Sequence, residues 1–321
     1  MTEKGILLLK EIKSEDMKKL EKAAADYTLI KAWDNDSEWD FPKEKIEILY
    51  GWDKEIGTAL LNDDHSQLRW IQASSAGVDF MNFDKLQEKG ILLTTASGIH
   101  SIPISESVFG MLLAYTRGIQ KSILNQTEKV WQIPKGMEEL NEKTMMILGT
   151  GHIGTEVGRL AKAFNMKTIG INHSGRKVET MDVIYRQEAF LDHLNEADII
   201  VNSLPLTDET ENFFNKKAFD KMKDGSLFIN VGRGPSVNQD DLISALTSGS
   251  LSFAGLDVFD NEPLESNSPL WEMSNVMITP HISGVAEKFR KRLFRIFEAN
   301  LNAYLSGNNL PKNLVDYRKE Y

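Results

Sequence analysis

Short apolar runs alternate with helix-period segments from the start of the chain. Runs rich in isoleucine, leucine and valine predict strands, and a segment with apolar residues three and four apart predicts a helix. Alternation at this spacing is typical of β–α–β units that build a parallel sheet. The first series predicts strands at 6–9, 46–50, 68–73 and 91–95, with a helix at 15–25.

The pattern then restarts after a long helical stretch that includes 105–117. A second series predicts strands at 144–148, 167–171, 198–202, 226–230, 253–257 and 276–278. We therefore expect two α/β domains, each a doubly wound parallel sheet. The basic run at 288–295 carries apolar residues at helical spacing. This pattern favours an amphipathic helix with a solvated charged face over an anion-binding role.

Length and composition narrow the class of protein. The 321 residues are enough for two domains, and 41% hydrophobic with 26% charged residues indicates a folded protein. The balance of 37 basic and 47 acidic residues gives a net charge of −10, which argues against a nucleic-acid surface. No apolar run approaches the ~20 residues of a membrane span, and no signal-peptide core is visible, so a cytoplasmic protein without a membrane partner is expected. The absence of cysteine excludes disulfides and thiolate catalysis.

A glycine-rich turn lies between a predicted strand and a predicted helix at 144–176. Gly149, Gly151 and Gly154 fit the spacing G-x-G-x-x-G, and a second apolar strand follows the helix. Glycines there permit a tight turn and close approach to a pyrophosphate, which the helix N-terminus attracts. Because the motif sits in the required strand–turn–helix–strand context, it predicts a dinucleotide site.

The end of the second strand is where the cofactor would be selected. A carboxylate there binds both ribose hydroxyls and repels a 2′-phosphate, but this chain has Asn172, followed by His173, Ser174 and Arg176. Those side chains can donate hydrogen bonds to a phosphate, which favours NADPH over NADH. The alternative is that Arg176 faces solvent and Asn172 binds an unphosphorylated ribose, so that both NADP and NAD are accepted.

An arginine, a glutamate and a histidine lie at or after the ends of three later predicted strands. They are Arg233, Glu262 and His281. Ligands of open parallel sheets bind at the carboxyl ends of the strands, so these groups are expected in one crevice. A surface ion pair of Arg233 with Glu262 is the alternative. No metal is expected, because no histidine or further carboxylate joins the acidic residues near Asp257 at ligand spacing.

Five ordered motifs carry a family resemblance. They are GTGHIG at 149–154, NSLPLTDETENFF at 202–214, NVGRG at 230–234, LDVFDNEP at 256–263 and TPHISG at 279–284. In order and spacing the chain resembles the D-isomer-specific 2-hydroxyacid dehydrogenase family, and within it the glyoxylate/hydroxypyruvate reductases. The resemblance implies that Arg233 holds the substrate, Glu262 supports the histidine and His281 is the acid/base.

The resemblance also implies the binding residues. For the substrate carboxylate, the segment at 73–79 resembles the family's binding loop, with backbone N–H groups near Ala76, Gly77 and Val78 as donors. Asp257 is expected near the nicotinamide carboxamide. Besides the residues at the end of the second strand, the implied cofactor contacts are Gly149, Gly151, His152, Ile153, Gly154, Leu204, Pro205, Thr210, Val231, Gly232, Asp257 and Gly284.

Spacing alone leaves open whether the predicted C-terminal helix at 285–305 completes the second domain or returns to the first. The resemblance implies that it returns. This gives a flavodoxin-like substrate domain at 1–101 plus 286–321 and an inserted Rossmann-type cofactor domain at 102–285. The segment at 103–143 would then pair two subunits, so a homodimer is expected. Trp131 is either part of that interface or a hydrophobic anchor within its own chain.

The chemistry of 2-keto acid reduction explains these residue types. NADPH supplies the hydride, protonated His281 supplies the proton, Glu262 favours the charged imidazolium, and the planar guanidinium of Arg233 holds the carboxylate. Residues 50–52 add aromatic bulk near the expected cleft and Lys54 is the only nearby cation, which favours glyoxylate, hydroxypyruvate or a short branched 2-keto acid. The alternatives are a phosphoglycerate dehydrogenase, a formate dehydrogenase, disfavoured by Glu262, and a non-enzymatic cofactor-sensing corepressor.

Overall fold

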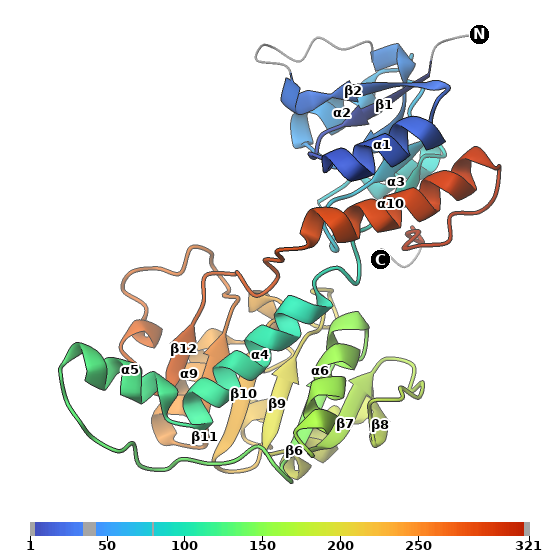
Figure 1. Cartoon of the computed structure of the whole chain (residues 1–321). Coiled ribbons are helices and arrows are strands. Elements are labelled where there is room, and N and C mark those ends of the chain that lie inside the picture. Colours follow the sequence, from blue (N-terminus) through green and yellow to red (C-terminus); the bar gives the residue numbers. More distant parts are fainter. Residues whose placement is uncertain (1–3, 35–42, 79, 318–321) are drawn as a thin grey trace. The chain divides into compact units, whose positions relative to one another are not determined.

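The computed structural model of the chain describes residues 4–34, 43–78 and 80–317. The chain divides into two compact units. The first unit comprises Met1–Ile99 and Ala286–Tyr321, and the second comprises His100–Val285. Each unit is built on its own parallel sheet with helices on both faces (Figure 1). The fold class predicted from the alternating pattern is therefore confirmed.

The first unit contains a five-stranded sheet in the order β2-β1-β3-β4-β5. This order is that of the flavodoxin-like fold, in which the connections run along both faces. All pairings within it are parallel. Its strands are β1 (Lys4–Leu8), β2 (Tyr27–Lys31), β3 (Ile46–Tyr50), β4 (Trp70–Gln72) and β5 (Leu92–Thr94).

Two apolar layers enclose this sheet. On one face the buried residues of α1 (Ser14–Ala23) and α10 (Phe289–Leu305) pack on β1 and β3. The two helices lie side by side (Figure 1). On the other face, α2 (Lys54–Asn62) and α3 (Phe83–Glu88) supply the buried residues. The amphipathic helix predicted over the basic run is part of α10, whose Leu293, Phe294 and Phe297 are buried.

The second unit contains a seven-stranded parallel sheet in the order β12-β11-β10-β9-β6-β7-β8. Chain order reverses between β6 and β9, which is the arrangement of a Rossmann-type dinucleotide-binding sheet. Its strands are β6 (Thr144–Leu148), β7 (Lys167–Asn172), β8 (Val183–Arg186), β9 (Ile199–Asn202), β10 (Ser226–Asn230), β11 (Leu251–Leu256) and β12 (Val276–Ile278).

The helices of the second unit also cover both faces. Buried residues of α4 (Ser101–Thr116) and α6 (His152–Ala163) form the core on one face, and the two helices pack on each other (Figure 1). The opposite face is covered by α7 (Phe190–His193), α8 (Lys216–Phe219) and α9 (Gln239–Ser248). The helix α5 (Ile119–Thr127) follows α4. In the described part of the chain, no helix has the length and apolar character needed to cross a bilayer.

The strands that sequence periodicity missed are β2 and β8. Both lie at the edge of a sheet, and neither contains a fully buried residue. Edge strands pair on one side only and carry polar side chains, so they lack the continuous apolar run of a central strand.

Candidate active site

The glycine turn joins β6 to α6 and can be explained position by position. Gly149 has φ +88°, a conformation that favours glycine. A Cβ on Gly154 would lie 2.0 Å from the carbonyl oxygen of Gly149, so only glycine lets the helix approach the turn. A Cβ on Gly151 would meet no protein atom within 4 Å. The turn therefore leaves open space beside its middle glycine.

That open space adjoins the start of a helix. The N-cap of α6 is Gly151, and the first hydrogen bond of the helix runs from the Thr155 N–H to the Gly151 carbonyl. The N–H groups of His152, Ile153 and Gly154 precede that bond and are left for a ligand. Backbone donors, the positive end of the helix dipole and room at Gly151 together fit a pyrophosphate.

At the end of β7, Asn172 holds the loop that follows it. Its Nδ2 donates to Thr150 Oγ1 at 2.9 Å and to the Arg176 carbonyl at 3.0 Å. The side chains of His173, Ser174 and Arg176 are exposed. The structure thus brings these side chains to the carboxyl end of the strand beside the glycine turn, with the amide of Asn172 bonded to both the turn and the loop.

Further residues of the second unit that were predicted to bind the cofactor lie in the loops after β9 and β10. Leu204 is buried and its N–H donates to Asn202 Oδ1 at 3.2 Å, while Thr210 Oγ1 donates to the Pro205 carbonyl at 2.7 Å. A Cβ on Gly232 would lie 2.7 Å from the Leu204 carbonyl oxygen, so the two loops are in close contact. Val231, buried beside it, donates its N–H to the Asn202 carbonyl.

Asp257, directly after β11, organises the loop that carries the histidine. Its side chain is fully buried and accepts hydrogen bonds from Thr279 Oγ1 at 2.6 Å, from the Ile282 N–H at 2.9 Å and from the Ser283 N–H at 3.0 Å. Its carbonyl accepts from the His281 N–H at 2.9 Å. These bonds hold the backbone on both sides of His281.

His281 and Glu262 are in direct contact. Glu262 Oε2 lies 2.8 Å from His281 Nδ1, and Glu262 Oε1 accepts from the Phe259 N–H at 3.0 Å. Since the carboxylate accepts, Nδ1 carries a proton and Nε2 is the atom that can exchange one. The imidazole is half exposed, at 51% of its side-chain area. His281 has φ +52°, an uncommon backbone conformation for a residue with a side chain.

Arg233 lies beside this pair without bonding to it. Its Nη1 donates to the Gly232 carbonyl at 3.0 Å, and among the described residues it forms no ion pair with Glu262. The next residue, Gly234, packs so closely on Phe259 that an added Cβ would lie 1.8 Å from the Phe259 oxygen. The backbone N–H of Phe259 in turn donates a hydrogen bond to the Glu262 carboxylate. The surface ion pair considered as an alternative is absent from this geometry.

The family model for the D-isomer specific 2-hydroxyacid dehydrogenase NAD-binding domain matches residues 109–283. That range is more than half of the chain and contains the glycine turn, Arg233, Glu262 and His281. The chain belongs to this family. It is therefore an NAD(P)-dependent D-2-hydroxyacid dehydrogenase, and the predicted family resemblance is confirmed.

The dehydrogenase is similar to characterised and solved relatives along most of its length. It is 35% identical over 280 residues to glyoxylate/hydroxypyruvate reductase B of an Enterobacter species, a match that covers 84% of each chain. A 2-hydroxyacid dehydrogenase family protein from Aeromonas salmonicida has 34% identity and a TM-score of 0.84, covering 98% of this chain and 99% of the other. The NADPH-dependent glyoxylate/hydroxypyruvate reductase of Sinorhizobium meliloti, solved with NADP and sulfate, has 25% identity and a TM-score of 0.79, covering 99% and 100%.

The predicted carboxylate loop of the dehydrogenase lies in the first unit, after β4. Ala76 is exposed, Gly77 is half-buried and the side chain of Val78 is buried. The carbonyls of Ser75 and Val78 accept hydrogen bonds from Ala96 and Met81. No described residue accepts from the N–H groups of Ala76, Gly77 or Val78, so these donors are available to a ligand.

Gly284 ends the histidine loop, and its carbonyl oxygen lies 2.7 Å from His100 Nδ1. This contact joins His100 to the loop that carries His281.

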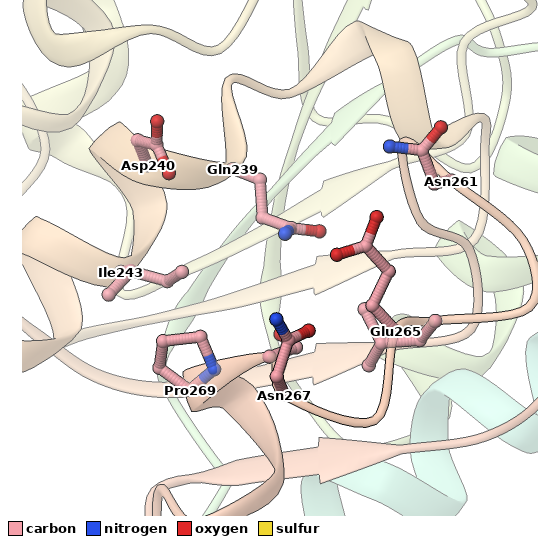
Figure 2. A pocket seen from close by; sticks show the side chains of 9 residues that line it. Gln239, Asp240, Ile243, Asn261, Glu265, Asn267 and Pro269 are labelled. Atoms are coloured by element: carbon pink, nitrogen blue, oxygen red, sulfur yellow. The ribbon is translucent and has the colours of Figure 1, made fainter.

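Surface hollows elsewhere contain none of the three predicted catalytic residues. One of about 310 Å³ in the second unit is lined largely by polar side chains, including Asp240 and Glu265 (Figure 2). Two carboxylates make it unfavourable for an anionic acid. Another, of about 410 Å³ in the first unit, is lined by Glu287 and five cations: Lys13, Lys288, Lys291, Arg292 and Arg295. Among the residues the structure describes, no cluster of three or more histidines and carboxylates could hold a metal.

Sequence reasoning missed the side chains that hold the loops. Asn202, Asn230 and Thr279 lie within the motifs quoted above, yet no role was predicted for them. The available signal was position: Asn202 and Asn230 are polar residues at the carboxyl ends of otherwise apolar strands. Such a residue is buried by its strand and faces the loop that follows.

Proposed function

We propose that this dehydrogenase reduces a small 2-keto acid such as glyoxylate or hydroxypyruvate to the D-2-hydroxy acid, with NADPH preferred over NADH. The observation that carries the proposal is the His281–Glu262 pair, at 2.8 Å, on a loop fixed by buried Asp257. The Enterobacter and Sinorhizobium relatives are both named as glyoxylate/hydroxypyruvate reductases, which supports the substrate class.

When bound, the nicotinamide cofactor supplies the hydride for the carbonyl carbon of the keto acid. We assign its pyrophosphate to the N–H groups at the start of α6 and to the open space at Gly151. The loop at 173–176 would hold the 2′-phosphate, and Leu204, Pro205, Thr210, Val231, Gly232, Asp257 and Gly284 would complete the cofactor site. The assignments at the glycine turn and the 173–176 loop rest on the geometry at the carboxyl end of the second sheet, and the others rest on the family resemblance.

His281 gives the proton to the carbonyl oxygen through Nε2, because Nδ1 is engaged with Glu262. The carboxylate stabilises the imidazolium before transfer and fixes the orientation of the ring. Arg233 offers a planar, positively charged fork that binds the substrate carboxylate or the developing alkoxide. For the substrate carboxylate we assign the N–H groups of Ala76, Gly77 and Val78, for which no described residue is an acceptor. This makes the first unit the substrate domain and the second the cofactor domain.

The proposal is tested by steady-state turnover of a panel of 2-keto acids with NADPH and with NADH. His281→Gln should lower kcat by about 10³-fold, since positioned acid/base groups contribute about 10²- to 10⁴-fold. His193→Gln is the matched control, because His193 also contacts a glutamate, Glu196, at 2.6 Å in the same unit. It should retain full activity. Unchanged turnover in His281→Gln would remove His281 from the mechanism.

A phosphorylated keto acid is the second candidate substrate. The cation-lined hollow in the first unit offers positive charge for a phosphate, although no residue of the predicted substrate site lines it. Including 3-phosphohydroxypyruvate in the panel tests it. A kcat/KM above that for glyoxylate and hydroxypyruvate would favour the phosphorylated substrate over the smaller acids.

We further propose that the enzyme is a cytoplasmic homodimer, paired through the segment at 119–137. Exposed apolar side chains gather there, and Trp131, at 101% exposure, anchors nothing in its own chain. An exposed apolar patch of this kind is typical of a protein interface. Light scattering should give twice the 36.3 kDa chain mass, and Ile133→Asp should give monomers. Cell fractionation tests the location.

A further inference from the structure

Three polar side chains at the carboxyl edge of the second sheet form a hydrogen-bond network that is buried away from solvent. Asn202 ends β9, Asn230 ends β10 and Ser236 lies in the turn after Arg233; they are 0%, 1% and 0% exposed. Asn202 Nδ2 donates to Asn230 Oδ1 at 3.0 Å and to Ser236 Oγ at 2.8 Å. The three side chains are thus joined into one unit.

This network holds the backbone on both sides of the predicted substrate arginine. Ser236 Oγ donates to the Arg233 carbonyl at 2.6 Å, and Asn230 Nδ2 donates to the same oxygen at 3.3 Å. Asn230 Oδ1 accepts from the Gly232 N–H at 3.1 Å. The peptide group after the Cα of Arg233 and the Val231–Gly232 peptide group one residue earlier are therefore both held by buried side chains.

The same network reaches the loop assigned to the cofactor. Asn202 Oδ1 accepts from the Leu204 N–H at 3.2 Å, and the Leu204 carbonyl contacts Gly232. The Asn202 side chain is therefore the member that bonds to both loops, whereas the Ser236 hydroxyl donates only to the loop that carries Arg233.

Stability alone does not explain this arrangement. Burying three polar side chains gains little over apolar residues of similar size, because their bonds to water are lost. What directional bonds add is position, and misplacing a catalytic group by ~1 Å can lower a rate by about 10²-fold. A network that ends on the Gly232 N–H and the Arg233 carbonyl, on either side of the Arg233 Cα, is suited to fixing that arginine.

We propose that Asn202, Asn230 and Ser236 are positioning residues that hold Arg233 in register with the cofactor loop. The inference rests on the proposed role of Arg233 in binding the substrate carboxylate. It goes further in assigning substrate affinity to three residues that touch neither substrate nor cofactor.

Ser236→Ala tests the network most cleanly, because the Arg233 carbonyl and Asn202 each keep another partner. We expect KM for glyoxylate to rise about tenfold, as expected for an arginine displaced by a fraction of an ångström. The Kd for NADPH, measured by fluorescence titration, should stay within twofold of the wild type. Ser226→Ala is the matched control: Ser226 is also buried, at the other end of β10, and its hydroxyl has no hydrogen-bond partner among the described residues. Its KM should not change.

A double-mutant cycle separates positioning from general stability. In an Arg233→Ala background, adding Ser236→Ala should change KM by less than about twofold, since the group that it positions is gone. A further loss equal to that in the wild-type background would overturn the inference. If Arg233→Ala itself leaves KM unchanged, the proposed role of Arg233 fails instead, so the two failures can be told apart.

Asn202→Ala provides the second arm. It should raise both KM for glyoxylate and Kd for NADPH, because Asn202 joins the two loops. An effect on the melting temperature with both constants unchanged would show that the network only stabilises the sheet, and would contradict the proposal.

Discussion

The two sheets follow the same parallel plan, and both place buried polar side chains at the ends of central strands. In the first unit, Gln72 ends β4 and donates to the carbonyls of Ala73, Thr94 and Thr95, and Thr94 Oγ1 donates to Gln72 Oε1. These hydrogen bonds join the carboxyl ends of the neighbouring strands β4 and β5. They hold the start of the loop at 73–78, and no described residue accepts from the N–H groups of Ala76, Gly77 and Val78.

In the second unit the equivalent side chains each reach a loop with an assigned catalytic or cofactor role. Asn202 holds the Leu204 loop, Asn230 holds Arg233, and Asp257 holds the loop of His281. The same local arrangement thus stabilises a sheet edge in one unit and, in the other, holds the loops that carry the proposed catalytic residues Arg233 and His281. Changes at the second edge should therefore affect binding and turnover, and changes in the core of the first should affect stability.

The glycine turn gives the largest expected effect. Gly154→Ala places a methyl 2.0 Å from a backbone oxygen and should cost about 3 kcal/mol of unfolding free energy, together with NADPH binding. Gly151→Ala meets no protein atom, so its stability should change by less than about 1 kcal/mol. Its NADPH affinity should still fall by about 10²-fold, because the methyl occupies the space assigned to the pyrophosphate.

Thermal unfolding and fluorescence titration measure the two quantities separately. If both glycine variants lost the same stability, the conclusion that Gly154 is needed for packing and Gly151 for cofactor binding would be wrong.

Glu262→Gln sharpens the comparison at the second edge. An amide cannot stabilise the imidazolium as a carboxylate does, and it can present N–H to Nδ1, so kcat should fall by about 10²-fold. Glu196→Gln alters the other histidine–glutamate pair of this unit and should leave kcat unchanged. Steady-state kinetics at saturating NADPH decide between these outcomes. Full activity of Glu262→Gln would make Glu262 dispensable for proton transfer.

Cofactor selection should respond more weakly, since Arg176 is exposed. Arg176→Ala should raise the Kd for NADPH by about tenfold through loss of a charge-assisted hydrogen bond, without changing the Kd for NADH. Lys177→Ala removes an adjacent exposed cation and is the control. Equal weakening of both cofactors in Arg176→Ala would contradict the assignment of this loop to the 2′-phosphate.

Glu47 in the first unit gives the smallest expected effect, and it concerns stability alone. Partial burial would raise the pKa of Glu47, but hydrogen bonds from Lys4, Tyr27 and Tyr304 outweigh it and lower the pKa below its ordinary value of 4.5. A lowered carboxyl pKa stabilises the folded state above the ordinary value, and this contribution is lost as pH falls through the lower folded-state pKa.

Glu47→Gln should therefore be about 1 kcal/mol less stable than the wild type at pH 7, and the difference should narrow below about pH 4.5. Urea unfolding at several pH values measures it. The kcat at pH 7 should be unchanged. If the difference in unfolding free energy between Glu47→Gln and the wild type stayed constant across this pH range, the substitution would destabilise through packing and not through loss of charge.

Periodicity and motif context predicted both parallel sheets and their central strands, because buried parallel strands are continuous apolar runs. Periodicity did not predict β2 and β8, because strands at the edge of a sheet tolerate polar residues. The family motifs predicted the residues of the His281–Glu262 contact, which the structure brings together. The hydrogen bonds of Asn202, Asn230 and Asp257 could not be predicted, since a polar residue at a strand end can face its own loop or a neighbouring one. Only the order of the strands in the sheet decides which of these loops the side chain faces.

The left-handed backbone of His281 limits what evolution or design can place there. Isoleucine, valine and threonine are disfavoured by their branched Cβ whatever their chemistry, whereas asparagine and glycine accept this conformation readily. An enzyme engineer who wishes to install a different proton donor at this position must therefore rebuild the loop first. Asparagine is the substitution that removes the imidazole while sparing the main chain.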